Sequence, residues 1–238
     1  PWAAILGISV VLGIQALFFG DGGLITFGAN CFNIAIVLPL VGYFIYKVIS
    51  ANSEPNSVRR LIGAVIGSYI GLVTAAFLTG IEFGLHPALF HAAEGTPLYA
   101  PSNLNVALPS MLIGHMIIAG PVEAIVTGGI FVYLQRTHSS LIQSDSPAKK
   151  EGKLWLLWGA LAVIALATPV GLLASGTAWG EWGAAELKDL GLNFIPLGIE
   201  KLAGWWPAPL PDYGFPRMGA VIGYIFSALI GIALVSFL

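Results

Sequence analysis

The chain has 238 residues, of which 57% are hydrophobic and only 9% are charged, with a formal net charge of −2. Soluble domains usually carry about 25% charged residues, so the composition argues against a soluble fold. The small negative charge excludes a global attraction for nucleic acid. The sequence has no GxxxxGK[ST] phosphate loop, which excludes ATP hydrolysis by that route.

Six long apolar stretches follow one another along the chain, five of them free of Asp, Glu, Lys and Arg. Because about 20 apolar residues span the hydrocarbon core of a bilayer as an α-helix, each stretch predicts a transmembrane helix. The sequence therefore predicts an all-α fold, a polytopic transmembrane helix bundle with about six helices. The expected helices cover residues 1–20, 24–46, 61–80, 105–134, 154–174 and 218–238.

The connecting segments alternate in charge. Cytoplasmic loops of membrane proteins are enriched in Lys and Arg, and here the second and fourth connections are basic while the other three are mostly acidic. We therefore expect the second and fourth connections, together with Pro1 and Leu238, on the cytoplasmic side. The basic residues concerned are Lys47, Arg59, Arg60, Arg136, Lys149, Lys150 and Lys153.

A polar cytoplasmic linker at residues 138–153 is expected to divide a block of four helices, residues 1–137, from a block of two, residues 154–238. The second block contains a long outer loop at 175–216, whose tryptophans are typical of a membrane–water interface. Small residues spaced four apart allow helices to approach closely in lipid, so they predict packing faces on the third and sixth helices. They are Gly63, Gly67 and Gly71 on the third helix, and Gly219, Gly223, Ser227 and Gly231 on the sixth.

His115 and Glu123 interrupt the fourth expected helix. A carboxylate at the bilayer centre costs about 2.5–3.5 kcal/mol on insertion scales, so Glu123 should face the bundle, be protonated or have a partner. On an ideal helix the two side chains would lie on one broad face. We interpret His115, Glu123 and Asn33, which is near a helix end, as candidate pathway or gating residues. Hydrogen-bonded helix contacts and helix capping are the alternative interpretations.

His86, His91 and Glu94 lie in the expected loop between the third and fourth helices. Imidazole and carboxylate groups are ligands of first-row transition metals, so the three residues are a candidate outer metal-collecting site. The alternative is a solvated loop with incidental histidines. The sequence contains neither HExxH nor GxSxG, and we expect no catalytic residues and no enzymatic activity.

Two ordered stretches of the first 136 or so residues resemble the CbiM/NikM family, the substrate-binding membrane subunits of cobalt and nickel energy-coupling-factor (ECF) transporters. They are PWAAILGISVVLGIQALFFGDGGLITFGANCFNIAI and LNVALPSMLIGHMIIAGPVEAIVTGGIFVYL, the second of which includes His115 and Glu123. The sequence from Lys149 onward resembles the CbiN/NikN accessory part, through its two-helix layout and the stretch GLLASGTAWGEWG.

The resemblance implies that a terminal amine and histidines near the family's amino terminus bind the metal. This chain starts at Pro1 in apolar sequence and lacks the family's Met-His-Ile-Pro-type and Ser-Gly-His-Leu-like motifs. We therefore expect an amino-terminally truncated chain whose primary metal ligands lie upstream of Pro1. A nitrogen-rich ligand set suits Ni²⁺ or Co²⁺ better than Mg²⁺ or Ca²⁺.

The function implied is that of the substrate-capturing subunit of an ATP-driven importer of cobalt or nickel ions, in the cell (inner) membrane of a bacterium or archaeon. The implied partners are a transmembrane coupling subunit and ABC-type ATPase subunits. Co²⁺ or Ni²⁺ would be cargo, and no covalently bound cofactor is expected. Two alternatives stay open: an ion-coupled secondary transporter with Glu123 as proton carrier, and a membrane assembly subunit without a substrate of its own.

Overall fold

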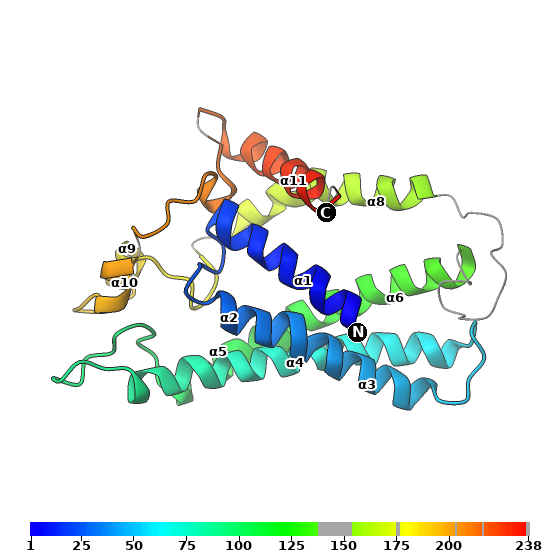
Figure 1. Cartoon of the computed structure of the whole chain (residues 1–238), viewed down its shortest axis with the longest axis horizontal. Helices are drawn as coiled ribbons and strands as arrows, with labels where there is room; N and C mark the ends of the chain where they lie inside the picture. The colour runs from blue at the N-terminus through cyan, green and yellow to red at the C-terminus, as the bar shows by residue number, and fades with distance from the viewer. Residues whose placement is uncertain (138–153, 175–176, 203, 216, 237–238) are drawn as a thin grey trace.

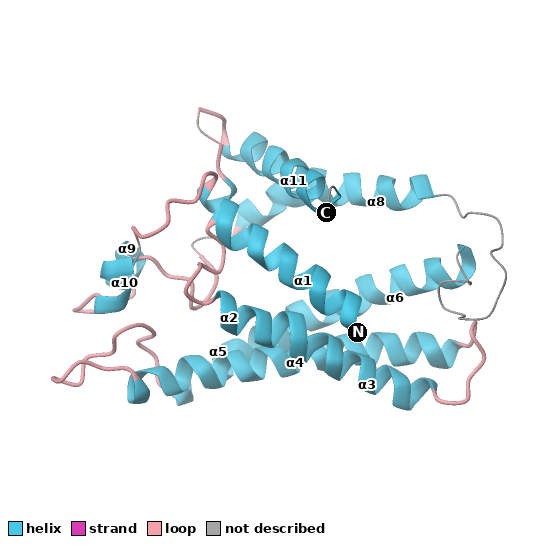
Figure 2. Cartoon of the chain, in the orientation of Figure 1, coloured by secondary structure: helices cyan, strands magenta, loops and turns pink. Residues whose placement is uncertain are grey.

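The computed structural model describes residues 1–137, 154–174, 177–202, 204–215 and 217–236. Regular structure in these residues is helical (Figure 2). The expected linker at 138–153 lies outside the described residues.

Within these described residues, four helices are long and apolar enough to cross a membrane, which confirms the all-α polytopic fold. Their large apolar side chains face outward, as Ile118 (68% exposed) and Ile125 (74% exposed) illustrate. Such a continuous apolar surface suits hydrocarbon and not water. The four helices are Trp2–Phe19 (α1 and η1), Phe27–Ser50 (α2, η2 and α3), Val58–Leu89 (α4) and Leu104–Thr137 (α5, η3 and α6).

Glycines bring α3 (Leu38–Ser50) and α4 into close backbone contact. Gly63, Gly67 and Gly71 are all buried on α4, and a Cβ on Gly67 would lie 2.6 Å from the carbonyl oxygen of Gly42 on α3. On another face of α4, a Cβ on Gly84 would lie 2.5 Å from Leu104 Cα at the start of α5. The predicted small-residue face of the third helix is confirmed, and α4 is the central packing element of the first block.

The third helix is longer than predicted. It continues from Gly80 to Leu89, so Glu82 and His86 are helical and the connecting loop starts only at Phe90. The expectation that the third helix ends at residue 80, with His86 in the following loop, was therefore wrong. The acidic residue ended the apolar run in the sequence, but inside the bundle it finds a hydrogen-bond partner on a neighbouring helix, which removes the reason for the helix to stop there.

Three of the long helices contain a π-helical segment, in which the hydrogen bonds run from residue i to i+5. These segments are η1 (Gln15–Phe19), η2 (Cys31–Val37) and η3 (His115–Ala119). Segments of this kind are rare and frequently occur at functional sites. η2 and η3 contain two of the residues that the sequence singles out, Asn33 and His115.

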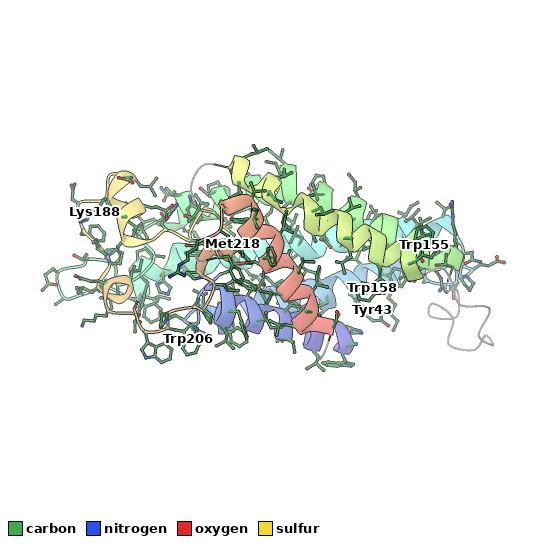
Figure 3. The ribbon with its side chains drawn as sticks, turned by 90° about the horizontal axis from the view of Figure 1, so that it is seen from above. Tyr43, Trp155, Trp158, Lys188, Trp206 and Met218 are labelled. Carbon is green, nitrogen blue, oxygen red and sulfur yellow. The ribbon has the colours of Figure 1, made fainter. Side chains whose placement is uncertain are left out.

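The second block begins with α8 (Leu154–Ala167) and η4 (Thr168–Leu173), and ends with α11 (Ala220–Ser236), at the positions expected for the last two helices. Between them lie α9 (Ala184–Asp189), α10 (Leu197–Leu202) and η5 (Pro211–Tyr213). Residues 177–202 and 204–215, which lie between η4 and α11, are called the lobe. It lies at the end of the molecule where α4 ends (Figure 1). Figure 3 shows Lys188 and Trp206 of the lobe far from Trp155 at the start of α8.

The predicted ladder on the sixth helix is only partly a packing face. Gly223 and Ser227 are buried, and the Ser227 hydroxyl donates to the carbonyl oxygen of Tyr213 at 2.8 Å. A Cβ on Gly219 or Gly231 would meet no atom within 4 Å. This ladder therefore contacts the lobe through its middle residues and leaves its two outer glycines open.

Candidate functional site

Asn33 joins η2 to α4 through a buried polar cluster. Its side chain is 1% exposed, and its Nδ2 donates to Thr79 Oγ1 at 3.1 Å and to Glu82 Oε2 at 2.8 Å. Thr79 in turn donates to the carbonyl oxygen of Ala75 at 3.0 Å. In hydrocarbon such bonds replace those that water would provide, so the cluster holds a half-buried carboxylate inside the bundle.

His86 continues this polar row by one turn of α4. Thr79, Glu82 and His86 follow one another at spacings of three and four, which places them on one face of the helix. Two atoms of the row are buried without a hydrogen-bond partner, Asn33 Oδ1 and His86 Nδ1. Buried polar atoms normally have partners, so the cluster has unused capacity to bind a ligand.

Aromatic rings surround the end of the row. The His86 ring lies 4.7 Å from the Phe90 ring and 5.3 Å from the Tyr99 ring, measured between centroids. From the lobe, the Trp179 ring contacts Phe83 edge-on at 5.8 Å, and the amide of Gly198 donates to the carbonyl oxygen of Leu98 at 2.7 Å. The second block therefore packs over the end of α4 beside the polar row.

The structure gives His115 and Glu123 local partners. His115 Nδ1 lies 2.7 Å from the carbonyl oxygen of Met111, and Thr127 Oγ1 donates to Glu123 Oε1 at 3.0 Å. Both side chains are half-buried. The π-helical segment between them changes the helix register, so the ideal-helix argument for one shared face does not apply. Their role as pathway or gating residues stays a prediction.

The candidate metal-collecting residues are spread over different elements. His86 is on α4, whereas His91 and Glu94 are exposed in the following loop, with His91 Nδ1 3.0 Å from the carbonyl oxygen of Ala92. No group of three or more His, Cys, Asp or Glu side chains in the described part of the chain is close enough to hold a metal ion.

A second junction joins the lobe to the end of η1. The Tyr213 hydroxyl donates to the Asp21 carboxylate, Gln15 Nε2 donates to Asp21 Oδ2 at 3.3 Å, and Trp206 Nε1 donates to the carbonyl oxygen of Leu17 at 2.9 Å. The Tyr213 ring stacks on Phe19 with centroids 4.7 Å apart. Burial raises the pKa of Tyr213, and the Asp21 hydrogen bond and charge raise it further, so the phenol remains a donor at neutral pH.

Sequence reasoning selected Asn33 but missed Glu82 as its partner. The two residues are 49 positions apart, and no local pattern predicts that separation. One signal was present: Thr79, Glu82 and His86 have helical spacing directly after an apolar run, which indicates that the helix continues through them.

Long apolar helices with outward-facing apolar side chains and a buried polar cluster define a multi-pass α-helical membrane protein. The profile of CbiM, described as the cobalt uptake substrate-specific transmembrane region, matches residues 1–141, and that of the PDGLE domain, which is CbiN-like, matches residues 153–238. The chain belongs to the CbiM family and carries a PDGLE domain after the CbiM region.

Some relatives match nearly the whole chain, and two of them illustrate this. The fused nickel transport protein NikMN of Rhodobacter capsulatus is 44% identical over 99% of this chain and 72% of its own length. A protein of Lactiplantibacillus plantarum, named "Probable fused nickel transport protein LarMN", is 39% identical over 96% of this chain and 69% of its own length. Both names describe fused proteins, which agrees with the two matched profiles.

A solved structure also resembles part of this chain. The crystal structure of a truncated transition metal transporter has 47% sequence identity and a TM-score of 0.53, over 57% of this chain and 62% of that chain. The match thus spans less than two thirds of that chain's length.

Proposed function

We propose that this protein is the substrate-capturing membrane subunit of an ATP-driven importer of Ni²⁺ or Co²⁺ in a bacterial or archaeal cell membrane. The observation that carries the proposal is the membership of residues 1–141 in the CbiM family, supported by relatives named as nickel transport proteins. The half-buried carboxylate of Glu82 and the buried amide of Asn33 supply polar groups in an otherwise apolar bundle, as the passage of a cation requires.

In this proposal the chain binds and passes the ion, while separate ATPase subunits hydrolyse ATP and a transmembrane coupling subunit transmits their motion. The basic connections lie in the cytoplasm. In support of this orientation, Gln135 Nε2 at the end of α6 donates to the carbonyl oxygen of Pro55 at 3.0 Å, and Arg60 donates to that of Ser53 at 3.1 Å. Basic residues of α4 and α6 therefore lie at one end of the bundle, opposite the lobe.

The division into a substrate-binding core at 1–137, a linker at 138–153 and an accessory part at 154–238 belongs to the same proposal. The accessory part would assist the core from the outer membrane surface. Its lobe contacts the ends of both η1 and α4, which supports such a role.

The test is uptake of radioactive Ni²⁺ and Co²⁺ by cells that express the complete protein with its coupling and ATPase subunits. We expect uptake of at least one of the two ions, and its loss when the ATPase carries a substitution that abolishes hydrolysis. Uptake that survives this substitution but stops when the proton gradient is removed would establish the ion-coupled alternative. A complete protein that binds neither ion would establish the assembly-subunit alternative.

A further inference from the structure

In the polar row of η2 and α4, the Asn33 amide offers two donor hydrogens and one acceptor oxygen, and only the donors have partners. Both hydrogens of the Asn33 amide group are used, one by Thr79 and one by the Glu82 carboxylate. The carboxylate accepts the hydrogen bond, which fixes the amide orientation and leaves Asn33 Oδ1 as the unpartnered atom. Asn33 is almost fully buried, so water does not reach this oxygen from bulk solvent.

A second unpartnered atom lies on the same face of α4. Glu82 and His86 are four residues apart, the spacing at which helical side chains are neighbours. His86 Nδ1 is buried without a partner, and the half-buried ring contacts Phe90 and Tyr99. The row therefore contains the Glu82 carboxylate, the unpartnered Asn33 Oδ1 and the unpartnered His86 Nδ1.

These three groups share one chemical requirement. A proton on Glu82 would neutralise its charge but leave Asn33 Oδ1 without a partner, whereas a metal cation accepts electron pairs from carboxylate oxygen, amide oxygen and imidazole nitrogen together. Oxygen ligands alone would suit Mg²⁺ or Ca²⁺, but an imidazole ligand favours a first-row transition metal. The His86 ring, half-buried against Phe90 and Tyr99, is partly shielded from water, which strengthens the attraction between the cation and the carboxylate.

We propose that Asn33 Oδ1, the Glu82 carboxylate and His86 Nδ1 form a binding site for one Ni²⁺ or Co²⁺ ion inside the helix bundle. The inference deepens the proposed transport function and rests on it for the identity of the ion. It assigns the site to residues of η2 and α4, and it explains why two polar atoms are buried without partners.

The experiment measures Co²⁺ bound to the complete protein in lipid nanodiscs, by equilibrium dialysis and by the visible absorption of the bound ion. We expect Glu82→Gln to bind one equivalent of Co²⁺ fewer than the wild type, and His86→Gln to bind that equivalent at least tenfold more weakly. The matched control is Glu200→Gln, an exposed carboxylate on α10, which should bind as the wild type does. Unchanged stoichiometry and affinity in Glu82→Gln would overturn the site.

Asn33→Asp tests the site with a variant that separates binding from a structural role. If Oδ1 is a ligand, a carboxylate at this position should tighten Co²⁺ binding at least threefold and change the absorption spectrum. If Asn33 only joins the helices, two adjacent carboxylates repel each other and lower the melting temperature without tightening binding, which would overturn the proposal. The exposed Asn52→Asp is the matched control for the added charge.

The transport proposal is tested separately. Robust uptake by the wild type together with unchanged Co²⁺ binding in Glu82→Gln would refute the proposed metal site and support the proposed transport function. Loss of one Co²⁺ equivalent in Glu82→Gln, together with absence of uptake by the wild type, would support the proposed metal site and refute the proposed transport function.

Discussion

Replacing Gly67 with alanine should destabilise the contact between α3 and α4. A Cβ at this position would lie 2.6 Å from the carbonyl oxygen of Gly42, about 0.8 Å short of ordinary contact, which begins at 3.4 Å. The opposing atom belongs to the backbone, so no side chain can rotate away and the helices must separate. Overpacking of this kind costs about 1–3 kcal/mol.

Alanine also favours a helix over glycine by about 0.5–1 kcal/mol, which offsets part of the cost. The net loss of up to about 2.5 kcal/mol corresponds to a fall in melting temperature of up to roughly 10 °C, at about 2–4 °C per kcal/mol for a chain of this size. Gly231→Ala is the matched control on α11, because a Cβ there meets no atom within 4 Å and only the helical gain remains.

The single cysteine provides the assay. Cys31 is half-buried in η2, so a thiol-reactive fluorescent dye reports its exposure as the protein is heated in detergent. We expect Gly67→Ala to melt below the wild type and Gly231→Ala at or above it. If Gly67→Ala melted at or above the temperature of Gly231→Ala, the close approach of α3 and α4 would be refuted.

Two further predictions concern the junction between the lobe and η1. Tyr213→Phe removes a hydrogen bond to the Asp21 carboxylate, and a bond to a charged partner is worth about 1.5–3 kcal/mol. The amide of Leu210 donates to the carbonyl oxygen of Phe18 at the same junction. Hydrogen exchange at this amide should therefore accelerate roughly 10- to 100-fold. The exposed Tyr43→Phe should leave that exchange unchanged, and equal rates in both variants would contradict the junction. Desolvation by burial and the negative charge of Asp21 raise the pKa of Glu181, although its side chain is still exposed to solvent. Its folded pKa lies above its unfolded pKa, so its contribution to stability is fully present below the ordinary value of 4.5 and is lost as pH rises through the folded pKa. Glu181→Gln should therefore raise the melting temperature at pH 7 and leave it nearly unchanged at pH 4, and a variant as pH-dependent as the wild type would show the reasoning to be wrong.

The positions of the long helices follow from the sequence because hydrocarbon imposes a single strong rule on every span. Apolar runs of the right length had to be helices, and the spacing of Gly63, Gly67 and Gly71 marked a face of close approach. The rule fails where a polar residue finds a partner inside the bundle. Glu82 ended the apolar run in the sequence, yet the helix continues to Leu89.

The candidate site was less predictable because its contacts join distant parts of the chain. Asn33 could be selected as a polar residue near a helix end, but its bond to Glu82 spans 49 positions. The lobe contacts are longer still, with 192 positions between Asp21 and Tyr213. Such pairs depend on how helices pack in three dimensions, and neither periodicity nor charge pattern contains that information.

The PDGLE domain is continuous in sequence with the CbiM region, and this has a consequence for the strength of the contacts between them. A covalent connection gives the lobe a higher effective concentration at its docking surface than a separate subunit would have. Contacts such as Trp206 to Leu17 and Tyr213 to Asp21 can therefore be individually weak and still keep the lobe docked. Each core also receives one lobe, so the stoichiometry is set by the gene and not by association between separate subunits.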